Sequence, residues 1–450
     1  MTRISDTQTP EAAITRFVAR FDPAGIPAQV LAEGRRSLVN IFATAFTGCD
    51  EAPIAAMRKT GLAFSSSETC TLIGRPERCD APTAAALNTA AANIFDFDDT
   101  HEATIIHPAA AVFAPLFAHA QVAQVSGRDL LAAFVLGCEV ECRMGNAMSP
   151  YHYAHGWHIT STCGIFGAAM AMGRLLGLDE TGLLHALSCA AAQSSGLVET
   201  LGTGAKSVSM GGAARNGYLS ALLAQNGCDG PALPLTGPRG YLKVYADAMK
   251  PECLTDGLGT EWEFGKNTYK PYPVGVVLNP VIEAVLDLRE TDGLRLEQVA
   301  RITLTGHPLL QQRTNRPDVT TGRETQVSAQ HAIAIALLTG RAGLDEFSDP
   351  AAARTLKTGR PTVDFIDDDS RAVDSVGFMI RTKDSRDLTR DIDHAAGSRA
   401  KPLPDDRLEA KLIAAATRAG FPGDTRALMD ALWQVDSAKD AGAIIALAGA

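Results

Sequence analysis

Residues 161–178 carry the sequence STCGIFGAAMAMGRLLGL. Apolar side chains return every three or four positions, which is the period of one face of an α-helix. Glycine and alanine fill many of the remaining positions, and small side chains let neighbouring helices approach closely. The segment therefore predicts a buried helix within a large bundle. Comparable helical patterns occupy residues 26–47, 83–97, 109–125, 129–148, 183–198 and 209–225.

The pattern changes after about residue 265. Residues 299–305 (VARITLT) and 375–382 (SVGFMIRT) alternate like β-strands, and residues 329–339 between them predict a helix. Helical spacing then returns near the C-terminus. We therefore expect a mainly α protein with two domains. These are a large all-helical bundle domain, residues 1–264 plus 400–450, and a smaller α+β lid domain, residues 265–399.

The composition is that of a folded globular protein, with 46% hydrophobic and 20% charged residues. The formal net charge of −10 argues against a general nucleic-acid binder, because phosphate binding needs a basic surface. No apolar run reaches the length of about 18 residues that a membrane span needs. The N-terminal residues lack the apolar core of a secretory signal. We therefore expect a cytoplasmic protein without a membrane or nucleic-acid partner.

The nine cysteines are scattered along the chain, and no CxxC motif occurs. This spacing argues against a disulfide framework and against a zinc or iron–sulfur site, each of which needs closer groups of cysteines. We expect no metal and no cofactor, and we interpret most of the thiols as small core residues.

An acidic run, Asp96-Phe97-Asp98-Asp99-Thr100-His101, ends one of the apolar helical segments. Negative charge is unfavourable near the C-terminus of a helix, so other groups must stabilise it there. One interpretation is a solvated acidic loop. The other is the edge of a pocket in which one aspartate orients a histidine, and His107 follows closely.

Three histidines, His152, His155 and His158, lie three residues apart and raise the question of a metal site. Gly156 and Pro150 favour a loop here, and no carboxylate at a familiar spacing completes a zinc ligand set. A single functional histidine, His158, is the simpler interpretation. It precedes a helix whose free N–H groups suit a carboxylate ligand.

Two lysines stand in unusual surroundings. Lys206 lies in the nearly uncharged, glycine-rich stretch GTGAKSVSMGG, which lacks the spacing of a phosphate-binding loop. It either extends its ammonium group to solvent or is buried against an anion. Lys270 begins the stretch KPYPVG, in which two prolines fix the backbone. It is either an exposed linker residue or a lysine held in place for binding.

Four motifs in this order resemble the MmgE/PrpD family: DFDDTH followed by HP, GWHxTxxxGxFGAAxAxGRLLGL, GLxExLGTxxKSxxxGxAARNG, and KPYP. This family includes 2-methylcitrate dehydratase, cis-aconitate decarboxylase and iminodisuccinate epimerase. The resemblance implies a large helical domain built from both chain ends, a smaller α+β lid and a homodimer. It also implies cofactor-independent chemistry at a cleft between the two domains.

The resemblance also implies which residues form the active site. The catalytic positions that it transfers to this chain are Asp96, His107, His158, Lys206 and Lys270, and the substrate-binding positions are Thr100, Lys206 and Lys270. Three features depart from the family pattern. Ser209 and Asn279 stand where relatives have histidine, and the stretch from Thr100 to His107 is one residue longer than in the decarboxylase pattern.

These residue types suit one kind of chemistry. The substrates of such enzymes carry two or three carboxylates and lose a proton or CO2 next to one of them. Two lysines balance the extra negative charge, and a histidine moves the proton near neutral pH. We expect a lyase, most simply a hydro-lyase of the 2-methylcitrate dehydratase type. The alternatives are an epimerase of an imino or amino dicarboxylate, a cis-aconitate-type decarboxylase, or a scaffold protein whose histidines and lysines point apart.

Overall fold

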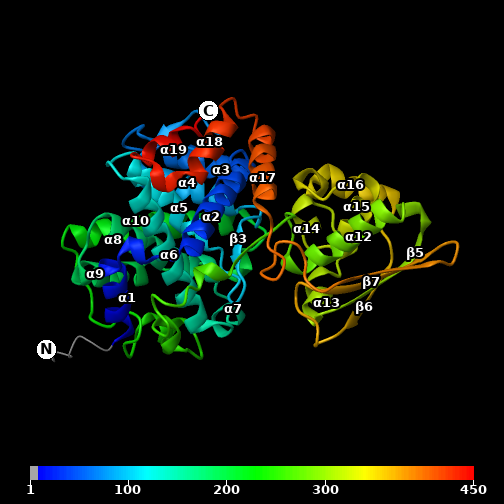
Figure 1. The fold of residues 1–450 in the computed structure, drawn as a ribbon, viewed down its shortest axis with the longest axis horizontal. Coiled ribbons are helices and arrows are strands. Elements are labelled where there is room, and N and C mark those ends of the chain that lie inside the picture. The colour runs from blue at the N-terminus through cyan, green and yellow to red at the C-terminus, as the bar shows by residue number, and fades with distance from the viewer. Residues whose placement is uncertain (1–8) are drawn as a thin grey trace. The chain divides into compact units, whose positions relative to one another are not determined.

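The computed structural model describes residues 9–450 and divides the chain into two units. Unit 1 contains the residues up to 267 together with 405–450, and unit 2 contains residues 268–404. The change in sequence pattern predicted this division at 264/265 and 399/400. Both ends of the described chain lie in unit 1, as the blue and red segments of Figure 1 show.

Unit 1 is helical, which confirms the predicted mainly α class. Its helices before the insertion are α1 (Pro10–Arg20), α2 (Ala28–Gly48), α3 (Ala52–Leu62), α4 (Ala81–Asn93), α5 (Pro108–Ala120), α6 (Gly127–Met148), α7 (Tyr151–Ala154), α8 (Ile159–Leu175), α9 (Glu180–Ala191), α10 (Gly204–Gln225) and α11 (Tyr241–Tyr245). Those after it are α17 (Asp405–Arg418), α18 (Thr425–Trp433) and α19 (Gly442–Ala446). Its short strands are β1 (Cys70–Thr71), β2 (Arg78–Cys79) and β3 (Asp99–His101), and β4 (Asn267–Tyr269) begins in this unit.

The centre of unit 1 is formed by α5, α6, α8 and α10, in which α8 packs against each of the other three. Helix α5 is apolar on nearly every side and almost fully buried, as expected for a central helix. Small residues allow the close contact between α6 and α8. A Cβ atom added at Gly137 would lie 2.7 Å from the backbone oxygen of Gly167.

Two predicted helices end earlier than their sequence pattern indicated. The pattern at 183–198 continues to Val198, but α9 ends at Ala191, and Gly196 has φ = 142°, a conformation that side chains other than glycine rarely adopt. The pattern at 83–97 likewise continues beyond Asn93, where α4 ends. The loops that follow these two helix ends carry or contact the histidines and lysine described below.

Unit 2 is the predicted smaller α+β unit. Its four-stranded sheet has the order β6-β5-β7-β8, in which β5 and β6 are parallel and the other neighbours antiparallel. The strands are β5 (Val299–Gly306), β6 (Val363–Asp367), β7 (Val376–Thr382) and β8 (Asp387–Ile392). The helices are α12 (Asn279–Thr291), α13 (Pro308–Thr314), α14 (Gly322–Thr325), α15 (Ala329–Thr339) and α16 (Asp349–Thr358). Side chains of α12, α15, β5 and β7 form its apolar core.

Within residues 9–450, no helix combines the length and the apolar character that crossing a lipid bilayer requires.

Candidate active site

The candidate site begins where α4 ends. The chain turns back after Asn93, whose carbonyl oxygen accepts a hydrogen bond from the backbone N–H of Asp96 at 3.2 Å. Asp96 has φ = 54°, a left-handed conformation that aspartate tolerates better than most residues. The turn leaves the Asp96 side chain about half exposed and directs Asp98 and Asp99 into the interior, where both are fully buried.

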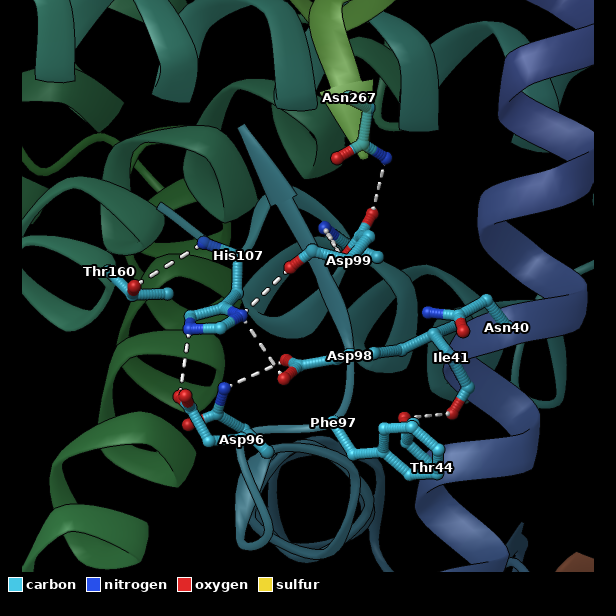
Figure 2. Close-up of polar contacts among 12 residues, drawn as sticks. Asn40, Ile41, Thr44, Asp96, Phe97, Asp98, Asp99, His107, Thr160 and Asn267 are labelled. Atoms are coloured by element: carbon cyan, nitrogen blue, oxygen red, sulfur yellow. Dashed lines mark hydrogen bonds and ion pairs between the residues drawn. The ribbon is translucent and has the colours of Figure 1, made fainter. Parts of the chain in front are cut away.

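His107 lies between two of these carboxylates (Figure 2). It precedes the first residue of α5, and its ring is almost completely buried. Its Nε2 atom lies 3.0 Å from Oδ1 of Asp96, and its Nδ1 atom lies 3.1 Å from Oδ1 of Asp98. Nδ1 also donates a hydrogen bond to the backbone oxygen of Asp99 at 2.8 Å. Both ring nitrogens therefore face oxygen acceptors.

This arrangement favours the charged form of the ring. Burial alone would lower the pKa of His107, but the carboxylates of Asp98 and Asp96 outweigh it and raise that pKa to about 9. Burial likewise opposes ionisation of Asp98, but the charge of His107 holds the pKa of Asp98 below its ordinary value. His107 is therefore an imidazolium at neutral pH, able to act as an acid.

Lys206 reaches the same carboxylate from α10. Its ammonium nitrogen lies 3.2 Å from Oδ1 of Asp96 and donates to the backbone oxygen of Asn93 at 3.1 Å. The side chain is buried, so the interpretation of a buried lysine paired with an anion is confirmed over a lysine in solvent. One oxygen atom of Asp96 thus bridges two cations, Lys206 and His107.

His158 belongs to the same electrostatic environment. It precedes α8 and is buried, and Nδ1 lies 2.9 Å from the hydroxyl oxygen of Ser161. Burial, and to a smaller extent the positive charges of Lys206 and His107, lower its pKa to about 3. His158 is therefore neutral at physiological pH. Among residues 9–450, no group hydrogen-bonds its Nε2 atom, which leaves this nitrogen able to take up a proton.

The other predicted positions lie as follows. Thr100 is buried in β3, next to Asp99. Lys270 is buried in unit 2, and its role in catalysis and substrate binding stays a prediction. Ser209 donates its hydroxyl to the backbone oxygen of Lys206 at 2.9 Å, and Asn279 is the first residue of α12 in unit 2.

Of the acidic run, only Asp96 and Thr100 were predicted to have a role in the site. In the structure, Asp98 also pairs with His107, and Asp99 fixes the base of the loop. One oxygen of Asp99 accepts hydrogen bonds from Ser37 at 2.6 Å and Asn267 at 2.8 Å. Burial and the nearby charge of Asp98 raise the pKa of Asp99 to about 6. Figure 2 shows this bond to Asn267.

The structure separates the three histidines that raised the question of a metal site. Both nitrogens of His152 are engaged, with the backbone oxygen of Tyr245 at 2.8 Å and the hydroxyl of Thr162 at 2.7 Å. His155 is exposed and lies 3.3 Å from Asp247. His158 is thus left as the member of the three that belongs to the site.

Among residues 9–450, one group of three side chains that could ligate a metal lies close together: Asp96, Asp98 and His107. The two carboxylates lie at different nitrogens of the imidazole ring, Asp96 at Nε2 and Asp98 at Nδ1. The ammonium group of Lys206 already pairs with Asp96. The arrangement therefore fits a hydrogen-bonded acid better than a metal centre.

Comparisons with known proteins agree with these motifs. Residues 12–254 match the MmgE/PrpD N-terminal domain, and residues 272–435 match the MmgE/PrpD C-terminal domain. The chain belongs to the MmgE/PrpD family. The predicted family resemblance is thus confirmed over both units.

Several MmgE/PrpD relatives have names that state an activity. The chain is 30% identical to the cis-aconitate decarboxylase-like protein oryM of Aspergillus oryzae over 76% of this chain and 77% of that protein. It is 26% identical to the cis-aconitate decarboxylase of Mus musculus over 93% and 89% of the two chains. The corresponding enzyme of Homo sapiens is 27% identical over 87% and 84%. Decarboxylases of this kind are lyases, which supports the broader prediction of a lyase-type enzyme.

Proposed function

We propose that this protein is a cofactor-independent lyase that acts on a small di- or tricarboxylate. The observation that carries the proposal is the pair of buried cations on one carboxylate oxygen, with a neutral histidine in the same electrostatic environment. Lys206 and His107 provide positive charge where a polyanion binds, and His158 provides a base. The net charge of −10 does not oppose this function, because the local potential of a pocket decides binding.

Each group has a distinct part in the proposed reaction. His158 accepts a proton from a carbon atom next to a substrate carboxylate, through its unengaged Nε2 atom. Lys206 stabilises the negative charge that this step places on the substrate. His107 donates a proton from Nε2 to the departing group, and its partner Asp98 keeps the ring oriented and charged. Asp96 holds both cations until the substrate carboxylate competes for them.

Elimination of water is the first candidate reaction, of the 2-methylcitrate dehydratase type. A hydro-lyase needs one group to take the carbon-bound proton and a second to protonate the departing hydroxyl. At one and the same pH, His158 is neutral and can take the proton, while His107 is charged and can protonate the hydroxyl. No metal-bound leaving group is required in this scheme, since an imidazolium protonates the hydroxyl.

Decarboxylation is the second candidate, and the names of the relatives favour it. Loss of CO2 leaves a carbanion that requires one proton donor, and His107 fits this role. Epimerisation of an imino or amino dicarboxylate uses the same first proton abstraction and remains the third alternative. A role for Lys270 in substrate binding and assembly into a homodimer, both implied by the family, are further parts of the proposal.

The test is a screen of small di- and tricarboxylates, including 2-methylcitrate and cis-aconitate, with the purified protein in heavy water. A hydro-lyase produces a carbon–carbon double bond, seen by ultraviolet absorbance, and a decarboxylase releases CO2. An epimerase incorporates deuterium without net loss of either group. If none of the compounds reacts or exchanges a proton, while the protein is folded, the proposal is wrong.

A further inference from the structure

Asn93, the last residue of α4, contacts three parts of the candidate site and was not singled out by the sequence patterns. It is 1% exposed. Neither its side chain nor its backbone belongs to the acidic run, which begins three residues later at Asp96. Its contacts nevertheless connect both cationic groups of the site.

The backbone of Asn93 holds the first of these groups. Its carbonyl oxygen accepts hydrogen bonds from the ammonium group of Lys206 at 3.1 Å and from the backbone N–H of Asp96 at 3.2 Å. The last carbonyl groups of a helix lack partners within the helix and carry partial negative charge, so they stabilise a cation. The end of α4 thus sets the position of Lys206 and of the turn at Asp96.

The side chain of Asn93 holds the second group indirectly. Its amide nitrogen donates to Oδ2 of Asp98 at 2.7 Å, while Oδ1 of Asp98 lies 3.1 Å from Nδ1 of His107. Asp98 is fully buried, so its carboxylate depends on such donors to remain ionised. A leucine of similar size would fill the same space but could not donate this hydrogen bond.

Only one of the two polar atoms in the side chain of Asn93 has a hydrogen-bond partner among residues 9–450. Among residues 9–450, no donor reaches its side-chain oxygen, although the atom is buried. A buried acceptor without a partner lowers stability, so an apolar residue would serve packing alone better than asparagine does. The geometry therefore points to the amide N–H group as the useful part of the side chain.

We propose that Asn93 is a positioning residue that fixes Asp98 against His107 through its amide and Lys206 beside Asp96 through its carbonyl. This inference rests on the proposed function, since it assigns to Asn93 the alignment of the acid and the lysine of that reaction. Asn93 itself does not touch the reacting atoms. Its side chain acts on His107 through Asp98, so its loss must change the pKa of His107.

The test compares Asn93→Leu with Asn88→Leu. Asn88 is a matched control, because it is a buried asparagine on the same helix whose side chain bonds the backbone oxygen of Thr71 and the backbone N–H of Ile73, both at 3.0 Å. The first measurement is the NMR titration of the His107 ring, identified by the signal that disappears in His107→Gln. It needs no substrate and therefore remains valid if the proposed function fails.

The charged and titratable groups that act on the His107 ring come from several elements: Asp96, Asp98, Asp99, Lys206 and His158. None of these is altered directly in the variants. In Asn93→Leu we expect the pKa of His107 to fall by about one unit, because the carboxylate of Asp98 is no longer held against the ring. In Asn88→Leu we expect no change in this pKa, although both variants melt at lower temperature than the wild type.

The second measurement is turnover of whichever carboxylate the screen identifies. We expect kcat of Asn93→Leu to fall about 10- to 100-fold with KM changed less, since misplacement of an acid affects the chemical step most. If Asn93→Leu fails to fold, Asn93→Ala and Asn88→Ala replace the pair. The inference is overturned if the His107 titration of the Asn93 variant matches that of the wild type, or if the Asn88 variant shifts it equally.

Discussion

Two helices of unit 1, α5 and α8, begin after a buried histidine, and these two histidines have opposite charge states. His107 precedes α5 and His158 precedes α8, and neither side chain caps its helix with a hydrogen bond. The pKa of His107 is raised to about 9, whereas the pKa of His158 is lowered to about 3. Position at a helix N-terminus therefore does not decide the charge of the ring.

The difference comes from the elements that face each ring. The loop after α4 places two carboxylates against His107, which outweigh the cost of burying a cation. His158 instead lies next to the hydroxyl of Ser161, and the positive charge of Lys206 lowers its pKa. The effect of burial on the pKa of His158 is therefore not offset. The candidate site thus holds a charged and a neutral ring of the same residue type, separated in pKa by their surroundings.

The strongest test of this comparison is His158→Gln, which removes the proposed base. We expect kcat to fall about 10^3-fold, within the range that a positioned general base contributes, while the helical circular dichroism signal stays unchanged. His155→Gln is the control, because His155 lies three residues earlier, is exposed and pairs with Asp247. Near-normal turnover of His158→Gln would assign the base to another group.

A second test, Lys206→Met, removes one positive charge from the site. This charge pairs with Asp96, which also pairs with His107, and it lowers the pKa of His158. We expect kcat/KM to fall about 10^2-fold, because the negative charge developed on the substrate loses its partner. The pKa of His158 rises, since one of the positive charges that lower it is gone. Both values are measurable, by kinetics and by NMR titration. A variant that binds and converts substrate normally contradicts the role of Lys206.

The sequence pattern predicted the central helices well and their ends less well. Helices α5, α6, α8 and α10 are apolar over long stretches, and burial stabilises such segments in a way that periodicity reveals. The ends of α4 and α9 depend on local turns instead. In unit 2 the apolar strands β5 and β7 were predicted, whereas the strands β6 and β8 were not.

The strands β6 and β8 were not predicted for a physical reason. Strand β8, DLTRDI, has an exposed, partly charged pattern, and its stability comes from pairing with β7 rather than from its own apolar residues. Strand β6 pairs only with the central strand β5. Such edge strands carry a weak signal in a single sequence.

The candidate site, like the fold, was predicted from the sequence only in part. Residue type and motif order indicated Asp96, His107, His158 and Lys206, and the structure brings these four into one electrostatic group. The role of Asp98 depends on the direction in which the chain turns at Asp96, which composition does not encode. The position of Lys270 relative to this group stays a prediction.

A third test, Asp98→Asn, makes the surroundings of His107 more like those of His158. We expect the pKa of His107 to fall by about two units, because a paired carboxylate shifts a neighbouring ionisable group by roughly one to three units. The raised pKa stabilises the folded state below the ordinary value of 6.5, and this contribution is lost as pH rises through about 9.

The stability of Asp98→Asn therefore has a defined pH dependence. Near neutral pH its free energy of unfolding is lower than that of the wild type by about 2 kcal/mol, and the difference shrinks as the pH passes 9. Urea denaturation at several pH values measures it. Asp129→Asn is the control, since Asp129 lies in the first turn of α6 and bonds Ser126 at the surface. An unchanged His107 titration would show that Asp98 does not set its charge.

The last test concerns Glu141, a buried carboxyl group near the same aspartates. It is fully buried on α6, and no group among residues 9–450 hydrogen-bonds either of its oxygens. A Cβ atom added at Gly167 of α8 would lie 2.9 Å from Oε2, which shows how closely the helices enclose it. Burial, and then the charges of Asp99 and Asp98, raise the pKa of Glu141 well above 4.5. The group is therefore neutral where Asp98 is ionised.

This difference predicts that Glu141→Gln changes stability but not the charge of either histidine. In the wild type, the unfolded chain ionises Glu141 above pH 4.5 while the folded protein keeps it protonated, so stability falls by up to about 1.4 kcal/mol per pH unit until the folded pKa is reached. Glutamine does not ionise, so Glu141→Gln does not show this loss of stability. The variant is thus more stable than the wild type above pH 4.5, by a margin that grows with pH.

Glu139→Gln, two residues earlier on α6, provides the opposite case. Glu139 lies 2.6 Å from the buried guanidinium of Arg143, so its replacement removes the carboxylate that pairs with this buried cation and lowers stability at neutral pH. Urea denaturation at about pH 5 and about pH 7.5 separates the two variants. If Glu141→Gln destabilises the protein at the higher pH, or moves the His107 titration, then Glu141 is ionised, and the charge of His107 depends on three carboxylates rather than two.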